Sequence, residues 1–320
     1  MNYSILFFEL TLALDTKAFR RQLDRAYKNA DKMDCRIYPV GFDHVDESHL
    51  SNGIGIRYYD NKHKKIRFVI YPGLVIGDND LSELWKPNSD NISRLREGLV
   101  SFVSGYFNSD YELNDFKLTR VDYAVDINVG SRERVYDYMK LLKGIRRVKL
   151  FSPIKDPKHD GTSFFGLKGR TNGVEFRAYD LKYDKKIRVE VRLLTKGVIR
   201  AYCDESDTSK QIKAMSKNSK HILMDTIQYV IPRGDHYKLK RTQELVTANV
   251  DDKTLRNKMI RILELVARKK SSLWSAQKAV NVRNIIDIMD KFAEIGLSPI
   301  TLGKRYKGKR IESLYNYMED

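Results

Sequence analysis

The stretch Leu118-Thr-Arg-Val-Asp-Tyr-Ala-Val-Asp-Ile127 alternates charged or small residues with apolar ones. Because successive side chains of a β-strand point to opposite faces, this alternation predicts a strand with one polar and one apolar face. Arg120, Asp122 and Asp126 share the polar face. Strands of this kind are typical of an antiparallel sheet that packs against a core on one side only.

Two further segments, Val174–Asp180 and Ile187–Leu193, show the same alternation. Their polar faces hold carboxylates, arginines and a tyrosine. These are Glu175, Arg177 and Tyr179 in the first segment and Arg188, Glu190 and Arg192 in the second. An ordinary solvated face explains any one of these strands, but three such faces favour a functional site if the strands are neighbours in the sheet.

The rest of the chain supplies more strands and then helices. Runs rich in β-branched and aromatic residues, bounded by Gly, Asn or Asp, predict further strands. The predicted strands are 4–14, 53–60, 65–71, 117–128, 163–169, 173–181 and 186–194. Apolar residues at three- and four-residue steps predict helices over Asn91–Phe107 and Ser131–Leu142, and mostly helix after residue 205.

This order predicts an α+β fold, with a largely antiparallel central sheet and flanking helices, followed by a smaller helical C-terminal domain. We expect a catalytic domain over residues 1–232 and a basic helical domain over residues 233–320. The net charge is +17 for the 320 residues and +8 within residues 233–320, which hold 19 Lys and Arg against 11 Asp and Glu. An excess of this size indicates a polyanionic partner, with nucleic acid favoured.

Several classes of protein are disfavoured. Two cysteines, Cys35 and Cys203, make no disulfide framework and suggest a reducing compartment, so we expect a cytoplasmic protein. No stretch is apolar enough for a membrane helix, and Glu9 argues against a signal peptide. The six histidines show no metal-ligand or catalytic spacing; His44 and His49 fall in Asp43–Asn52, which is predicted to be a loop.

The polar strand faces suggest a cation site. Asp122 and Asp126 lie about 13 Å apart along a straight strand, too far to hold one ion alone. Glu190 from a neighbouring strand would complete a site with one of them. A few hard oxygen ligands suit Mg²⁺ or Mn²⁺, which bind together with phosphate and water. The arginines of these strands suit phosphate oxygens, which a guanidinium grips with two hydrogen bonds.

Tyr179 is the candidate nucleophile, because a phenolate bound to phosphorus keeps the energy of a cut phosphodiester for later religation. Arg177 or Lys182 would help to stabilise its charge. Tyrosine is also a common strand residue, and the chain has 19 of them. Tyr183 and Tyr202 are therefore kept as reserve candidates.

At these strands the sequence resembles the replication initiators of the filamentous-phage gene II/X family and, more widely, the Rep-trans plasmid initiators and relaxases. The resembling blocks are Arg120-Val-Asp-Tyr-Ala-Val-Asp126, 162–168, Phe176-Arg-Ala-Tyr-Asp-Leu-Lys182, Ile187-Arg-Val-Glu-Val-Arg192 with Thr195-Lys196, 70–79 and 282–301. Each block is short, and the resemblance lies in their succession. The family's lysine after the proline in 70–79 and the paired histidines of the better-known relaxases are missing here.

The resemblance implies a fold of the Rep and relaxase kind and a site-specific, metal-dependent endonuclease that starts rolling-circle replication. It implies a covalent bond between a tyrosine and the 5′ phosphate of one nicked strand. By position Tyr179 matches the family tyrosine, and Asp122, Glu190 and Asp126 match its acidic positions. The implied partners are single- and double-stranded origin DNA, with the host helicase and polymerase, in the cytoplasm of a bacterial host.

The C-terminal tail adds a cluster of positive charge. Its predicted DNA contacts are Lys304, Arg305, Lys307, Lys309 and Arg310, beside the predicted contacts Arg120, Arg177, Arg188 and Arg192 of the strands. With the helical stretch Leu273–Leu297, the tail suggests a helix-turn-helix-like module. Two alternatives stay open: a non-enzymatic DNA-binding replication factor whose strands form a nucleic-acid platform, and a mobilisation relaxase with the same chemistry.

Overall fold

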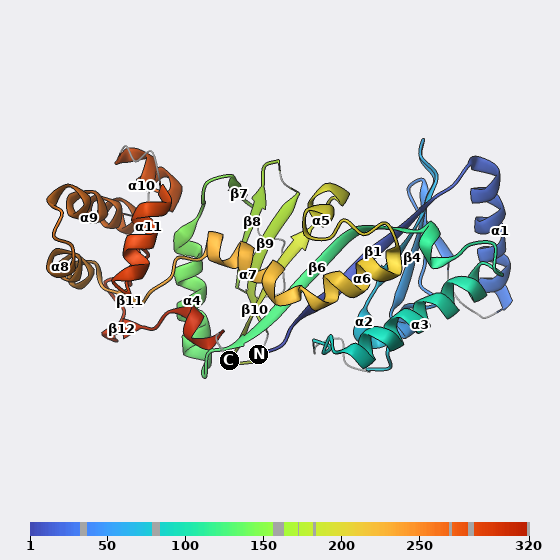
Figure 1. The fold of residues 1–320 in the computed structure, drawn as a ribbon, viewed down its shortest axis with the longest axis horizontal. Helices are drawn as coiled ribbons and strands as arrows, with labels where there is room; N and C mark the ends of the chain where they lie inside the picture. Colours follow the sequence, from blue (N-terminus) through green and yellow to red (C-terminus); the bar gives the residue numbers. More distant parts are fainter. Residues whose placement is uncertain are drawn as a thin grey trace. The chain divides into compact units, whose positions relative to one another are not determined.

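A computed structural model of the chain describes residues 1–32, 37–78, 84–155, 163–171, 173–181, 184–268, 271–280 and 285–318 (Figure 1). Ten strands form the main sheet: β1 (Tyr3–Ala13), β2 (Ile37–Val40), β3 (Asp43–Asp46), β4 (Ile54–Tyr59), β5 (Lys65–Ile70), β6 (Lys117–Asn128), β7 (Phe151–Pro153), β8 (Phe164–Gly169), β9 (Val174–Asp180) and β10 (Lys186–Leu193). Their order in the sheet is β2-β3-β4-β5-β1-β6-β10-β9-β8-β7.

Helices flank the strands and make up most of the C-terminal part. They are α1 (Thr16–Lys32), α2 (Pro72–Val75), α3 (Ser89–Tyr106), α4 (Arg132–Ile145), α5 (Lys196–Tyr202), α6 (Thr208–Lys217), α7 (Ser219–Val230), α8 (Leu239–Asn249), α9 (Lys253–Ala267), α10 (Leu273–Ala279) and α11 (Ile285–Glu294). Two short strands, β11 (His236–Tyr237) and β12 (Arg310–Ile311), pair antiparallel in a second sheet. No helix of the described residues has the length and apolar character of a membrane span.

The fold class predicted from the sequence is confirmed: the protein is α+β, with a largely antiparallel sheet and a helical C-terminal region. Strands β1, β4, β5, β6, β8, β9 and β10 match the seven predicted strands to within a few residues. The strands with polar faces are neighbours, since β10 lies between β6 and β9. Ser131 caps helix α4 as predicted, because its side chain accepts a hydrogen bond from the Arg134 amide.

The chain divides into two compact units, and each is described by itself. Unit 1 comprises residue 1 with 126–190 and 224–320, and unit 2 comprises 2–125 with 191–223. Strands β6 and β10 each contribute residues to both units. This division does not test the predicted boundary at residue 232, which stays a prediction.

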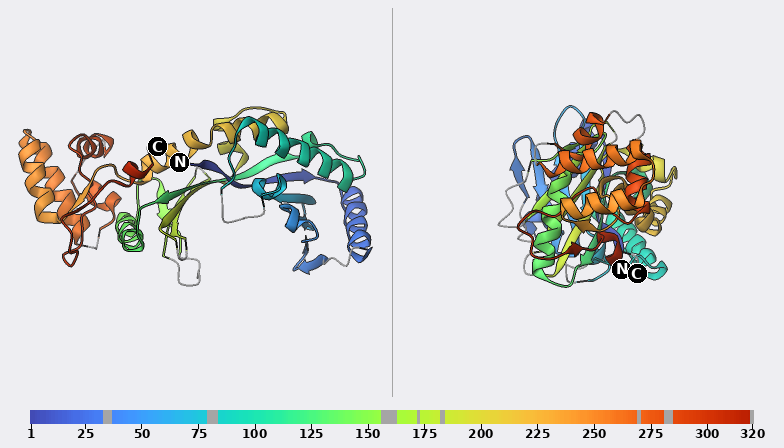
Figure 2. Two further views of the ribbon diagram at one scale, coloured as in Figure 1. Left: turned by 90° about the horizontal axis from the view of Figure 1, so that it is seen from below. Right: turned by 90° about the vertical axis from the view of Figure 1, so that its left-hand side faces the viewer.

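Unit 2 buries one face of its strands under aromatic side chains. Phe68 of β5 stacks on Phe107 and Phe116, with ring centroids 5.8 and 5.0 Å apart, next to the end of α3. Figure 2 shows α3 and α6 covering one side of β1 and β6. Because Phe68 follows Arg67 along the strand, Arg67 points to the opposite face. The core therefore occupies one face of these strands and leaves the other to polar side chains.

In unit 1, helix α4 packs beside β8 and β9. The C-terminal segment is held against α4 by a hydrogen bond, in which the Tyr138 hydroxyl donates to the Glu312 carbonyl at 2.9 Å. His236 of β11 is buried, and its Nδ1 lies 2.8 Å from the Ile300 carbonyl oxygen. Burial lowers the pKa of His236 to about 4, although the Ile300 contact works in the opposite direction.

Two local expectations differ from the structure. Asp43–Asn52 was predicted to be a loop, but Asp43–Asp46 forms strand β3 and Leu50–Asn52 a short 3₁₀ helix. Strand β3 is polar and short, and it forms because it pairs with β2 on one side and β4 on the other. Helix α1 was not predicted at all, although its residues are strongly amphipathic.

Candidate functional site

The candidate nucleophile and one candidate acidic residue meet on neighbouring strands of unit 1. The Tyr179 hydroxyl on β9 donates a hydrogen bond to a carboxylate oxygen of Glu190 on β10. Glu190 is almost fully buried, at 1% exposed, whereas Tyr179 is half-buried. The structure thus places a carboxylate where it can accept the phenolic proton.

Arg188 lies on the same strand face as Glu190 and binds Asp126 of β6 with two parallel hydrogen bonds. Arg188 Nε lies 2.6 Å from Asp126 Oδ1, and Arg188 Nη2 lies 2.7 Å from Asp126 Oδ2. Arg188 is 5% exposed, so this pair is largely desolvated. Because a carboxylate fixes the guanidinium, Arg188 is held in one orientation beside Tyr179 and Glu190.

The surroundings of Tyr179 keep its hydroxyl protonated at neutral pH. Burial raises the pKa of Tyr179 well above its ordinary value, and the negative charge and hydrogen bond of Glu190 raise it further, while Arg188 lowers it. Asp126 raises the pKa of Arg188 against the effect of burial, so Arg188 stays a cation. A nucleophilic role for Tyr179 therefore requires a partner that takes its proton, and Glu190 is in contact with it.

Glu175 and Arg177 form a second ion pair on β9, with Arg177 Nη2 2.9 Å from Glu175 Oε2. Lys168 of β8 lies 3.6 Å from the same carboxylate. The Arg177 Nε atom is buried, and no described residue accepts a hydrogen bond from it. This side chain, predicted to contact DNA, is thus oriented by Glu175.

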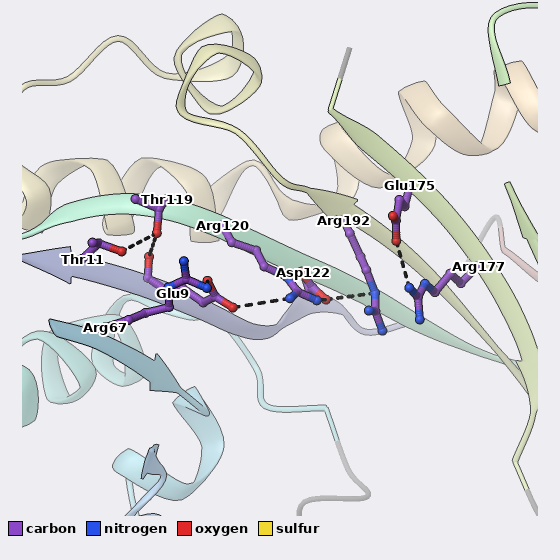
Figure 3. A network of polar contacts seen from close by, with 9 residues as sticks. All are labelled: Glu9, Thr11, Arg67, Thr119, Arg120, Asp122, Glu175, Arg177 and Arg192. Atoms are coloured by element: carbon purple, nitrogen blue, oxygen red, sulfur yellow. Dashed lines mark hydrogen bonds and ion pairs between the residues drawn. The ribbon is translucent and has the colours of Figure 1, made fainter. Parts of the chain in front are cut away.

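Unit 2 has its own network of arginines and buried carboxylates (Figure 3). Asp122 on β6 is completely buried and accepts hydrogen bonds from Arg120 Nε at 2.7 Å and Arg120 Nη2 at 2.8 Å. Arg192 Nε of β10 lies 3.0 Å from Asp122 Oδ2, the oxygen that also accepts the hydrogen bond from Arg120 Nη2. Removal of this carboxylate would take a buried partner from both Arg120 and Arg192.

The network continues to two residues that the sequence analysis did not identify, Glu9 and Arg67. Glu9 of β1 is 6% exposed and lies 3.0 Å from Arg67 and 3.4 Å from Arg120. A β-bulge between Glu9 and Leu10 adjusts the register so that Glu9 faces Arg120. A carboxylate in the middle of an apolar strand was the available signal, since such a residue needs a buried partner.

The two pairs Asp122–Arg192 and Asp126–Arg188 run in opposite order along β6 and β10. This order is expected for antiparallel neighbours. Every predicted acidic residue therefore has a side-chain partner: Asp122 and Asp126 contact arginines, and Glu190 contacts Tyr179.

These contacts decide which carboxylate oxygens are open to the predicted divalent cation. Within the described ranges, no group of three or more His, Cys, Asp or Glu side chains is placed to hold a metal ion. The carboxylates are turned toward guanidinium and phenol groups instead of toward one another. Among the described residues these carboxylates do not form a chelating group, and the predicted Mg²⁺ or Mn²⁺ stays a prediction.

The remaining predicted residues lie elsewhere or outside the described ranges. Lys182 and Tyr183 lie outside them, as does Cys35. Tyr202 ends α5 and faces His221, with ring centroids 6.3 Å apart. The tail residues Lys304, Arg305, Lys307, Lys309 and Arg310 are all exposed.

The tail forms a loop that leads into β12, and Arg310 lies 3.3 Å from Asp235. The predicted helix-turn-helix pair corresponds to α10 and α11, but residues 281–284 between them lie outside the described ranges. The DNA-binding role of this module stays a prediction.

No protein-family model matches the sequence, and no curated protein matches it. Among solved structures, the chain is similar to a rolling-circle replication initiator protein from Geobacillus stearothermophilus. The match covers 95% of this chain and 99% of that chain, with 11% sequence identity and a TM-score of 0.32.

Proposed function

We propose that the protein is a DNA nicking and joining enzyme that initiates rolling-circle replication, with Tyr179 as its nucleophile. The observation that supports this proposal is the contact between the Tyr179 hydroxyl and the buried carboxylate of Glu190, with the cation Arg188 beside both. A hydroxyl, a proton acceptor and a fixed positive charge are the groups that phosphoryl transfer to a side chain needs.

In the proposed reaction, the Tyr179 Oη atom attacks the phosphorus of one phosphodiester, and the phenolic proton passes to Glu190. The bond from phosphorus to the 3′ oxygen breaks, and that oxygen takes a proton from solvent. The products are a free 3′ hydroxyl and a tyrosine ester of the 5′ phosphate. Because the ester keeps the bond energy, attack by a 3′ hydroxyl reverses the reaction and rejoins the strand.

The charge of the protein supports DNA as the substrate. The net charge is +17, and the exposed tail concentrates five cations between residues 304 and 310. In this proposal, single-stranded origin DNA binds at the β-strands around Tyr179, and double-stranded DNA binds at the tail. A bacterial cytoplasm, and a host helicase and polymerase that extend the free 3′ end, complete the proposed setting.

A divalent cation, Mg²⁺ or Mn²⁺, remains part of the proposal, although its ligands are not assembled in this structure. Phosphate oxygens compete with carboxylates for arginines, so DNA binding is the event that would release Asp122 or Asp126 for an ion. Nicking measured in EDTA and after addition of Mg²⁺ tests this requirement. Equal rates in the two conditions would remove the cation from the proposal.

The central test is covalent labelling. A random library of single-stranded oligonucleotides labelled at the 3′ end is incubated with the protein, and the adduct is detected on a denaturing gel. The label must be on the 3′ side because the tyrosine retains the downstream fragment. We expect an adduct with the unaltered protein and none with Tyr179→Phe.

Tyr229→Phe is the matched control, because Tyr229 is also in unit 1, is 43% exposed and donates only to the Lys149 carbonyl. It should form the adduct normally. An adduct in Tyr179→Phe would reject the assignment and direct attention to the reserve candidates Tyr183 and Tyr202. The absence of any adduct or nick in the unaltered protein, with DNA binding retained, would favour a non-enzymatic DNA-binding factor. A mobilisation relaxase would give the same adduct.

A further inference from the structure

A basic hollow lies on the polar face of unit 2. None of the residues that line it takes part in the proposed chemistry. Its volume is about 300 Å³. Its walls hold four cations, one carboxylate and two threonine hydroxyls. The lining residues are Thr11, Ala13, Lys65, Arg67, Asp115, Lys117, Thr119 and Lys196.

Strand register explains why cations from distant parts of the sequence gather here. Thr11 of β1 is paired with Arg67 of β5 on one side and with Lys117 of β6 on the other. The three residues therefore form one row across three strands. Lys65 lies two residues from Arg67 and hence on the same face. Lys196, the first residue of α5, completes the ring.

The hollow has more cations than carboxylates among the described residues that line it. Arg67 has Glu9 as its partner at 3.0 Å. Within the described part of the chain, no carboxylate forms an ion pair with Lys65, Lys117 or Lys196. The one carboxylate present, Asp115, already accepts a hydrogen bond from the Glu112 amide at 2.8 Å. Gathered cations repel one another, and a bound anion would relieve this repulsion.

We propose that this hollow binds a phosphate group and that this group belongs to the backbone of the single-stranded DNA; the assignment of DNA rests on the proposed function. A phosphate presents several charged oxygens in different directions, which suits ammonium groups arriving from two strands and a helix. The volume exceeds that of a phosphate alone and leaves room for the attached sugar. Arg67 belongs both to the hollow and to the arginine network, so a DNA strand bound here would continue along the same face.

The test compares two double variants that lose the same charge. Lys117→Gln with Lys196→Gln removes two exposed cations of the hollow, and Lys17→Gln with Lys28→Gln removes two exposed cations of helix α1. Binding of a thirty-nucleotide (dT) strand is followed by fluorescence anisotropy over a range of salt concentrations. Titration with inorganic phosphate and with dTMP, followed by calorimetry, forms the second arm. Melting temperatures check that both variants are folded.

We expect the hollow variant to bind the strand at least about tenfold more weakly than the control variant, because charged hydrogen bonds are lost. Its dependence of log Kd on log salt should be shallower by about 0.7 for each phosphate contact removed. Equal affinity and equal slope for the two variants, with equal binding of inorganic phosphate, would overturn the proposal. Loss of inorganic phosphate and dTMP binding alone would reject DNA as the source of the phosphate.

The outcome of the strand-binding test does not depend on whether Tyr179 is the nucleophile. Strand binding is measured without cleavage, so the comparison of the two double variants is the same whichever residue is the nucleophile. If Tyr179 fails as the nucleophile, the hollow is still tested. If the hollow fails, the adduct assay still decides the chemistry.

Discussion

The role of Glu190 as proton acceptor gives the sharpest prediction. We consider Glu190→Gln, which keeps the size of the side chain and removes its ability to take a proton. A tyrosine hydroxyl has an ordinary pKa of 10.0. Even without the charge of Glu190, burial raises the pKa of Tyr179 above that value. At pH 7 the fraction present as phenolate is therefore below about one in a thousand.

If the variant must use that preformed phenolate, adduct formation at pH 7 should fall about a thousandfold, within the range that general bases contribute. Each unit of pH above 7 should then raise the variant's rate about tenfold, because the phenolate fraction rises tenfold while the pH stays below the tyrosine pKa. The unaltered protein, which needs no preformed phenolate, has no such slope. The difference between the two should therefore shrink about a hundredfold between pH 7 and pH 9.

The assay is the rate of adduct formation with the 3′-labelled oligonucleotides between pH 7 and 9. Glu264→Gln is the matched control, because it makes the same change in unit 1 at a carboxylate of α9 that is paired with Arg261, outside the proposed site. It should stay within a few-fold of the unaltered protein. A loss below tenfold at pH 7, or a loss that does not change with pH, would refute the reasoning. Recovery by added Mg²⁺ instead of by pH would make Glu190 a cation ligand, as expected from the sequence.

Three further predictions concern stability and DNA binding. Asp122→Asn should lower the free energy of unfolding, measured in urea, by about 3 kcal/mol, because two arginines lose a buried partner. Asp110 also contacts two arginines, Arg21 and Arg25, but is more exposed, so Asp110→Asn should cost less than about 1 kcal/mol. Equal effects of the two changes would contradict this. Asp122→Asn should also weaken (dT) binding although it adds positive charge. The pKa of His236 is about 4 in the folded protein and 6.5 in the unfolded chain. As the pH falls from about 7 to 4, the unfolded chain takes up this proton first, so the free energy of unfolding should fall by about 3 kcal/mol at pH 4. His236→Asn should remove that part of the acid sensitivity. Lys304→Gln with Lys307→Gln should weaken duplex binding and reduce its salt dependence by up to about 0.9 per lost phosphate contact, while leaving adduct formation on single strands unchanged.

Alternation along the chain was sufficient to predict the strands and their polar faces. Tyr179, Glu190 and Arg188 were all named from the sequence, and the structure brings them together on β9 and β10. Their roles were not predictable, because a period of two gives the face of a residue but not its partner on the next strand. Glu190 was expected beside an ion, whereas the structure shows it beside a tyrosine.

Elements that depend on pairing escaped prediction for the same reason. Strand β3 has the sequence Asp-His-Val-Asp, which no propensity favours as a strand, and it exists because β2 and β4 flank it. Glu9 was noticed only as a residue unsuited to a signal peptide. Its function in the network depends on Arg67 and Arg120, which are 58 and 111 residues away in the sequence.

The buried carboxylates of unit 2 have a role that is consistent with the proposal that this face binds a polyanion. Asp122 lowers the net charge by one, and on electrostatic grounds alone it should weaken DNA binding. It also fixes Arg120 and Arg192, at 2.7 and 3.0 Å, in single orientations on the sheet. A free arginine loses much rotamer freedom when it grips a phosphate, whereas a guanidinium already held by a carboxylate loses less. A guanidinium has five N–H donors and a carboxylate takes two of them in a forked pair. The sign of the Asp122→Asn effect on strand binding therefore separates two explanations: orientation of the arginines predicts weaker binding, and net charge alone predicts tighter binding.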